Sequence, residues 1–259
     1  MKNITLISDW KLRDPYVGMF KGELFTAFPD MNIIDITHSL QNYHLPQTAF
    51  ILKNSYKSFP KGTLHIILTG ISLSETSPLV ITQYDDHWFL GKDTGIFSLL
   101  FENEYKQLKA WQYPKKDGKS INAKIMEMIE WCFEQTLENN ALIYPNDKFV
   151  YKTTFKPSYS QANNTITGEV IFIDGAANAI TNIPVSLFHE ARQNRNFTLK
   201  ISSRKELITS EYHGYYRETE ESIYLVPNRL GFIEISFYPA YIAAIAAIYV
   251  NDRVEISFK

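Results

Sequence analysis

Short apolar runs alternate with amphipathic segments in the first half of the chain. Between the first two runs, residues 15–28 carry apolar side chains at helical spacing, and residues 46–56 repeat this pattern before the third run. Such alternation predicts a mostly parallel sheet with helices on both faces. A long amphipathic helix is expected at residues 120–139. The runs typical of buried strands are residues 4–7, 32–36, 63–68, 79–83 and 88–90.

The composition changes after about residue 140. Residues 141–166 are rich in Pro, Asn, Ser and Tyr, which is typical of a linker with loops. Further on, apolar runs and turn residues alternate at the spacing of a small antiparallel barrel or sandwich. We therefore expect an α/β domain at residues 1–140 and a smaller all-β, barrel-like domain at residues 167–259. The apolar runs are residues 169–174, 197–201, 222–227, 231–237 and 253–258.

Composition and charge narrow the function classes. The 259 residues carry a net charge of −2, which argues against a partner that is a nucleic acid or an anionic membrane. Cys132 is the only cysteine, which excludes an internal disulfide and a cysteine-cluster metal site, and its helical setting predicts a buried structural role. The first ten residues lack the layout of a signal peptide, and no apolar run approaches about 18 residues. We expect a cytoplasmic protein.

Asp9 ends the first predicted strand, at the place where α/β proteins keep their ligands. The surrounding segment reads ITLISDWKLRDPYVGMFKG from residue 4 to residue 22. An acid at this position either caps the following turn or binds a ligand, and the residue type alone leaves both roles open.

Five motifs in order along the chain point to a family. They are SDWKLRDPYVGMFKG, FPDMNIIDITHSLQNYHLPQTAFILKNSYKSFPKGTLH, DDHWFLGKDTGIFSLLF, GEVIFIDGAANAITNI and LVPNRLGFIEIS. Together they resemble the S-adenosylmethionine hydroxide adenosyltransferase family, which also contains fluorinases and chlorinases. The resemblance implies an α/β domain, a β-barrel domain, and a homotrimer with ligand sites between one subunit's first domain and its neighbour's second.

The reaction that this resemblance implies is attack at C5′ of the ribose in S-adenosylmethionine, with methionine expelled. Water or hydroxide yields adenosine and L-methionine, whereas a halide yields a 5′-haloadenosine. S-adenosylmethionine is then the substrate or ligand, and no metal or other cofactor is expected.

Several residues take roles from this resemblance. Asp9 is implied to grip the two ribose hydroxyls, Tyr43 to pack over the sugar, and Asp14 to border the methionine portion. Asp174 and Asn178 are implied to bind methionine's ammonium and carboxylate. The ligand-binding positions are Asp9, Trp10, Asp14, Pro15, Tyr16, Tyr43, Gly70, Asp174, Asn178, Asn228, Arg229 and Phe232.

Each of these positions also has an ordinary structural interpretation. A Pro-Tyr turn accounts for residues 14–16, an exposed loop tyrosine for Tyr43, and a β-turn entering a strand for residues 228–232. The resemblance implies that Asn228, Arg229 and Phe232 read the adenine, with Phe232 as the stacking candidate. Ala176 and Ala177 stand where the family usually has an aromatic residue and a glycine, which puts the backbone bend before Asn178 in question.

The sequence departs from the hydrolytic members of the family at their water-handling groups. Those members carry an acid in the turn after the third strand, an arginine shortly after it, and a histidine before the long helix. Here Thr69 or Gly70 replaces the acid, residues 77–78 replace the arginine, and residues 117–128 contain no histidine. The remaining catalytic candidates are weak, because hydroxyls need a partner to act as bases. They are Ser72, Ser74 and Glu75, and a solvated loop charge explains Glu75 better than a catalytic role does.

Three hypotheses follow. The first is an enzyme that cleaves S-adenosylmethionine to adenosine and methionine with weakened water activation. The alternative is a catalytically silent protein that binds S-adenosylmethionine or adenosine, and a halide-using transferase ranks below both. A scaffold without a ligand would not need the binding motifs that this chain retains.

Overall fold

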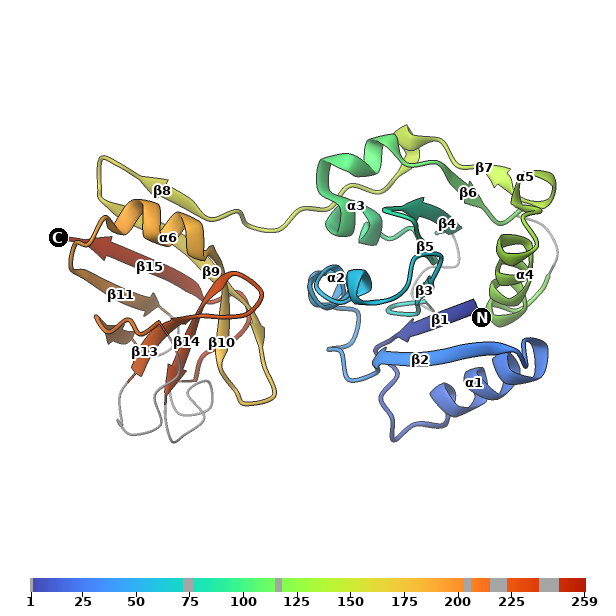
Figure 1. The fold of residues 1–259 in the computed structure, drawn as a ribbon, viewed down its shortest axis with the longest axis horizontal. Helices are drawn as coiled ribbons and strands as arrows, with labels where there is room; N and C mark the ends of the chain where they lie inside the picture. Colours follow the sequence, from blue (N-terminus) through green and yellow to red (C-terminus); the bar gives the residue numbers. More distant parts are fainter. Residues whose placement is uncertain (1, 72–76, 115–117, 203–205, 215–222, 238–246) are drawn as a thin grey trace. The chain divides into compact units, whose positions relative to one another are not determined.

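The chain divides into two units, Met1–Thr154 and Phe155–Lys259. The computed structural model describes residues 2–71, 77–114, 118–202, 206–214, 223–237 and 247–259. The ribbon in Figure 1 follows both units from the blue amino terminus to the red carboxy terminus. The predicted linker, residues 141–166, falls on both sides of the boundary between the units.

One mixed sheet of seven strands forms the centre of the first unit, in the order β2-β1-β3-β5-β4-β6-β7. Strands β2, β1, β3 and β5 are parallel, whereas β4, β6 and β7 run antiparallel to their neighbours. Asp85 and Asp86 have φ values of 52° and 61°, which suit the tight turn that joins β4 to β5. The strands are β1 (Lys2–Ile7), β2 (Met31–Thr37), β3 (Leu64–Ile67), β4 (Leu79–Tyr84), β5 (His87–Lys92), β6 (Ala110–Gln112) and β7 (Leu142–Ile143).

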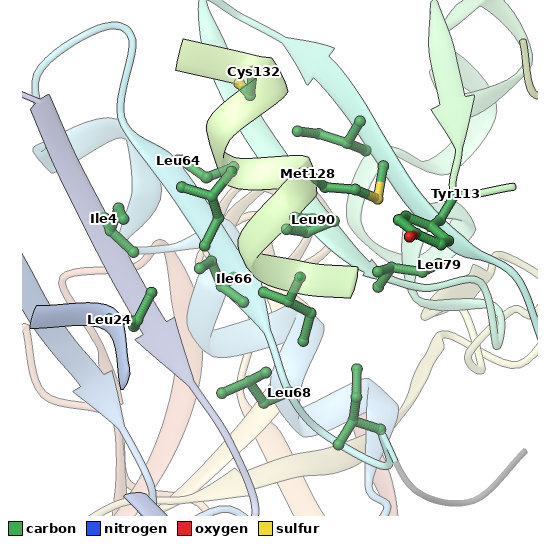
Figure 2. Packing of buried hydrophobic residues seen from close by; sticks show 14 of the residues in the cluster. Ile4, Leu24, Leu64, Ile66, Leu68, Leu79, Leu90, Tyr113, Met128 and Cys132 are labelled. Atoms are coloured by element: carbon green, nitrogen blue, oxygen red, sulfur yellow. The ribbon is translucent and has the colours of Figure 1, made fainter. Parts of the chain in front are cut away.

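Helices cover both faces of this sheet. Side chains of α1 and α4 pack with Ile4 and Leu6 of β1 in one core cluster. Side chains of α2 and α3 pack with Ile7 in a second cluster on the opposite face. Figure 2 shows the first cluster, where Met128 of α4 lies among the buried strand residues. The helices are α1 (Pro15–Ala27), α2 (Leu45–Lys53), α3 (Ile96–Phe101), α4 (Ile121–Phe133) and α5 (Leu137–Asn140), with 3₁₀ turns at Tyr56–Ser58, Glu102–Gln107 and Asn146–Lys148.

The long helix predicted at residues 120–139 is two helices. Ser120 caps the first of them, because its Oγ accepts from Ala123 N at 3.2 Å. The helix ends at Phe133, and Gln135 takes a left-handed φ of 61° before α5 begins. A non-glycine residue in this conformation ends an α-helix, and the apolar pattern alone did not reveal it. Cys132 is buried in α4, as Figure 2 shows.

An antiparallel sheet makes up the second unit, in the order β12-β11-β15-β9-β10-β14-β13, with β8 paired to β9. The sheet curls so that the segment after β12 reaches β13, where Leu225 exchanges backbone hydrogen bonds of 2.9 Å with Glu211 and His213. The predicted α/β domain followed by a barrel-like domain is therefore confirmed. The elements are β8 (Ser158–Ser160), β9 (Thr165–Ile173), β10 (Ala179–Pro184), α6 (Val185–Arg192), β11 (Phe197–Ser202), β12 (Glu206–Thr209), β13 (Ile223–Pro227), β14 (Phe232–Phe237) and β15 (Arg253–Phe258).

A buried hydrogen-bond chain of Thr5, His65 and His87 crosses the first sheet. Thr5 Oγ1 lies 2.7 Å from His65 Nδ1, and His65 Nε2 lies 3.2 Å from His87 Nδ1. Burial, and then the neighbouring His87, lower the pKa of His65 to about 3. Burial also lowers the pKa of His87, although Asp85 and Asp86 oppose this shift. Both rings are therefore neutral at neutral pH.

Acidification is expected to destabilise the first unit. Unfolded His65 takes up a proton below about pH 6.5, whereas folded His65 does so only near pH 3, so stability falls as the pH drops through this window. The slope from one such group reaches about 1.4 kcal/mol per pH unit. Urea unfolding at about pH 7 and about pH 5 measures it. His65→Gln should flatten the dependence, whereas His189→Gln, at an exposed histidine, should not; equal slopes in all three proteins would contradict the assignment.

Candidate functional site

The carboxyl ends of β1 and β3 meet where the connections of the sheet change direction. Strand β1 lies between β2 and β3, and the connections through α1 and α2 leave on opposite faces. In open α/β sheets, ligands bind in the crevice that opens at such a switch point. Asp9 follows β1, and Gly70 follows β3. The topology therefore identifies this edge as a candidate site independently of any motif.

Asp9 is nearly buried at this edge and is held by backbone N–H groups from two distant loops. Its Oδ2 accepts from Tyr43 N at 2.8 Å and from Gly70 N at 3.3 Å. Among the residues that the structure describes, no hydrogen-bond donor contacts Oδ1. Tyr43 and Gly70 have φ values of 60° and 63°, the left-handed region that favours glycine. Asp9 therefore does not cap the turn that follows it, and one carboxylate oxygen is left for a ligand.

The local cap is Ser8, which sequence reasoning did not single out. Ser8 Oγ accepts from Trp10 N at 3.3 Å and lies 2.6 Å from His38 Nδ1. His38 Nε2 in turn lies 3.2 Å from Asp35 Oδ1. Burial would raise the pKa of Asp35, but the hydrogen bond from Lys21 and the approach of His38 hold it below its ordinary value. In the sequence, the only sign of this contact was a serine directly before the strand-end acid and a histidine after the second strand.

The other predicted residues of the first unit lie on the chain that leaves β1 or precedes α2. Trp10 packs edge-on against Tyr16, with ring centroids 6.5 Å apart. Tyr16 is 59% exposed and Tyr43 is 50% exposed, so both rings are open to solvent in this chain. Asp14 occupies the N-cap position of α1 without a side-chain cap, and Pro15 is the first residue of that helix.

The position of the family's acid carries no ionisable side chain here. Thr69 is buried, and its Oγ1 lies 3.1 Å from Thr48 Oγ1. Gly70 contributes its N–H to Asp9. His44 caps α2 by accepting from Gln47 N at 3.0 Å, and burial lowers the pKa of His44. The predicted catalytic candidates Ser72, Ser74 and Glu75 lie outside the described residues.

Asp174 and Asn178 lie together in the turn between β9 and β10. Asp174 Oδ1 accepts from Ala176 N at 2.9 Å and from Asn178 N at 2.8 Å, and Oδ2 accepts from Asn178 Nδ2 at 3.1 Å. Ala177 has a φ of 57°, so the turn keeps a left-handed residue where the family usually has glycine. The turn therefore bends before Asn178 through an L-residue in a strained conformation.

The turn between β13 and β14 gathers the three residues predicted to read adenine. Asn228 Oδ1 accepts from Leu230 N and Phe232 N, each at 3.0 Å, which fixes the turn. Asn228 Nδ2 is buried and has no hydrogen-bond partner among the described residues. Arg229 is exposed, and Phe232 is the first residue of β14. The fold of the turn thus engages the oxygen of the Asn228 amide and leaves its Nδ2 group uncommitted.

The structure does not bring these two turns of the second unit together. Strand β10 pairs with β14 so that Ala179 faces Ile235 and Pro184 faces Phe232. The turn before β10 and the turn before β14 thus lie at opposite ends of β10. Five residue steps of strand separate those ends, which corresponds to about 17 Å.

The described part of the chain offers neither a metal cluster nor a membrane-spanning helix. Within it, no group of three or more His, Cys, Asp or Glu side chains is arranged to hold a metal ion. None of its helices is both long enough and apolar enough to cross a membrane.

Comparison with known proteins places both units in one family. Residues 4–129 match the SAM hydroxide adenosyltransferase N-terminal domain, and residues 168–255 match the SAM hydroxide adenosyltransferase C-terminal domain. A protein of Methanocaldococcus jannaschii named (R)-S-adenosyl-L-methionine hydrolase is 22% identical over 98% of this chain and 95% of its own length. A protein of the same name from Thermus thermophilus is 26% identical over 38% of each chain.

Solved structures support the fold over the whole chain. The crystal structure of an uncharacterized conserved protein from Thermotoga maritima has a TM-score of 0.78 at 20% identity, covering 99% of this chain and 100% of that one. A conserved hypothetical protein from Thermus thermophilus has a TM-score of 0.71 at 16% identity, covering 99% of this chain and 100% of that one.

Replacing Ala177 with glycine is expected to stabilise the second unit. Glycine adopts a φ of 57° without the steric cost that alanine meets, a difference of about 1 kcal/mol. Ala176→Gly is the matched control, because this neighbour has no positive φ, and glycine there should cost about 0.5–1 kcal/mol. Thermal unfolding of both variants measures the contrast. Destabilisation by both substitutions would contradict a strained Ala177.

Proposed function

Because the chain belongs to the S-adenosylmethionine hydroxide adenosyltransferase family, we propose that it binds S-adenosylmethionine and adenosine and cleaves S-adenosylmethionine to adenosine and L-methionine. The observation that carries the proposal is Asp9, a nearly buried carboxylate at the switch point of the sheet. Two backbone N–H groups engage Oδ2. Oδ1 is then the acceptor for the 2′- and 3′-hydroxyls of the ribose, a charge-assisted contact of the strong kind.

The chemistry asks little of the protein beyond alignment. The sulfonium makes methionine a good leaving group, so general-acid assistance is not needed. A water molecule must lie opposite the sulfur at C5′ and lose its competing hydration. Fixing the ribose through Asp9 places C5′, which accounts for orientation of the substrate but not for activation of the water.

Water activation is the weak part of the site. Thr69 or Gly70 stands where the family's acid is expected; Gly70 has no side chain, and the hydroxyl of Thr69 is engaged with Thr48. A hydroxyl does not remove a proton from water at neutral pH without a basic partner. We therefore propose slow hydrolysis. The same observation favours the second candidate function, a silent protein that binds S-adenosylmethionine or adenosine. A halide-using transferase ranks below both, because none of the described residues identifies a halide site.

Asp9→Ala is expected to weaken adenosine binding by about thirty- to one hundred-fold, because about 2–3 kcal/mol of charge-assisted hydrogen bonding is lost. Isothermal titration calorimetry measures the affinity. Asp9→Asn, which keeps an acceptor without the charge, should give an intermediate loss. Asp30→Ala, at an exposed acid of the same unit, should leave the affinity unchanged. Unchanged affinity in a folded Asp9→Ala protein would remove Asp9 from the site.

Hydrolysis is expected to be about 10²–10⁴ slower than in a family member that carries the acid, arginine and histidine, the span typical of lost acid–base assistance. To test this, each sulfonium epimer of labelled S-adenosylmethionine is incubated with the protein. The adenosine and methionine formed are then measured by chromatography. Product at a reduced rate supports the enzyme, and binding without product supports the silent protein. Equal rates would show that the missing groups are not needed here.

The homotrimer implied by the family resemblance stays a prediction.

A further inference from the structure

The turn that carries Asp9 is fastened to the end of β2 by contacts on both sides of that acid. Ser8 N donates to Thr37 O at 3.0 Å, and Lys11 N donates to His38 O at 2.9 Å. Ser8 Oγ lies 2.6 Å from His38 Nδ1. Residues 37–38 therefore hold the chain immediately before and shortly after Asp9.

The short contact between Ser8 and His38 is assigned a direction from its surroundings. Ser8 Oγ accepts from Trp10 N and keeps its own proton, so we assign that proton to the contact with His38 Nδ1. The other ring nitrogen, Nε2, then carries the proton and faces Asp35 Oδ1 at 3.2 Å. Asp35 is held in turn by Lys21 at 2.9 Å. Among the described residues Nε2 has no hydrogen-bond partner of good geometry, so the approach to Asp35 is electrostatic, and Ser8 is the hydrogen-bond partner that orientates the imidazole.

Neither Ser8 nor His38 can reach a ligand. Ser8 is fully buried, and His38 is 2% exposed. Any effect of these residues on binding must therefore pass through the backbone turn to Asp9. The turn needs such support, because Lys11 is a non-glycine residue with a φ of 63°, a conformation that persists only where the surroundings enforce it.

We propose that His38 is a positioning residue of the ligand site. Through Ser8 it holds the turn at residues 8–11 in the conformation that presents Asp9 to the ribose, so that the carboxylate is already in place before the ligand arrives. Preorganisation of this kind raises affinity by removing an ordering cost from the binding step. The inference rests on the proposed function, since it assigns His38 a part in the same ribose contact.

Adenosine affinity in a set of paired variants tests the proposal. Ser8→Ala and His38→Ala should each weaken binding about tenfold, the equivalent of one buried hydrogen bond. His38→Asn should restore most of the loss, because its amide oxygen can accept near the position of Nδ1. In an Asp9→Ala background, Ser8→Ala and His38→Ala should change affinity by less than about twofold, since they act through the missing carboxylate.

Thr5→Val is the matched control. It removes a contact of the same type, between Thr5 Oγ1 and His65 Nδ1 at 2.7 Å, on the strand that leads to Ser8. It should lower the unfolding temperature without changing adenosine affinity. The Ser8 and His38 variants are expected to lower both the unfolding temperature and the adenosine affinity.

The outcomes separate this inference from the function on which it rests. Equal losses of affinity with and without Asp9 would mean a general structural role and overturn the proposal. Binding that depends on Asp9 but ignores Ser8 and His38 would overturn the positioning role alone. Absence of adenosine and S-adenosylmethionine binding by the unaltered protein would overturn the proposed function and this inference together.

Discussion

The contact between Asp9 Oδ2 and the N–H groups of Tyr43 and Gly70 joins three segments that are far apart in sequence. It ties the end of β1 to the end of β3 and to the loop that enters α2. A nearly buried carboxylate is costly unless it is hydrogen-bonded, and both of its donors belong to residues in left-handed backbone conformations. The carboxylate therefore stabilises both loops in these conformations.

A second acid repeats this arrangement in the other unit. Asp174 accepts from two backbone N–H groups of its own turn, and Ala177 supplies the left-handed residue. In both places the carboxylate stabilises a loop, and what it keeps for a further hydrogen bond is its remaining lone pairs. Asn228 follows the same logic with an amide, because its oxygen fixes the turn and its buried Nδ2 is left over. Each candidate ligand group thus belongs to a side chain that is already fixed by hydrogen bonds to its own loop.

The apolar pattern predicted the helices and strands that local periodicity determines. The first five strands and both early helices follow from it, because buried positions recur at fixed spacing. The short strands β6 and β7 and the break at Gln135 were missed, since they depend on pairing partners and one backbone dihedral. For Asp9, the sequence left capping and binding open. The approach of Tyr43 and Gly70 to Asp9, which argues against the capping role, depends on tertiary structure, and the same holds for the contact of Ser8 with His38.

Thr69 lies directly beside the backbone N–H that supports Asp9. An acid at position 69 would stand next to the N–H that Gly70 gives to Asp9. Two carboxylates so close to one another repel, and burial intensifies the repulsion. A threonine paired with Thr48 removes that cost and leaves the support of Asp9 intact. The absence of an acid at position 69 therefore avoids electrostatic repulsion next to Asp9, the carboxylate on which the proposed ribose contact rests.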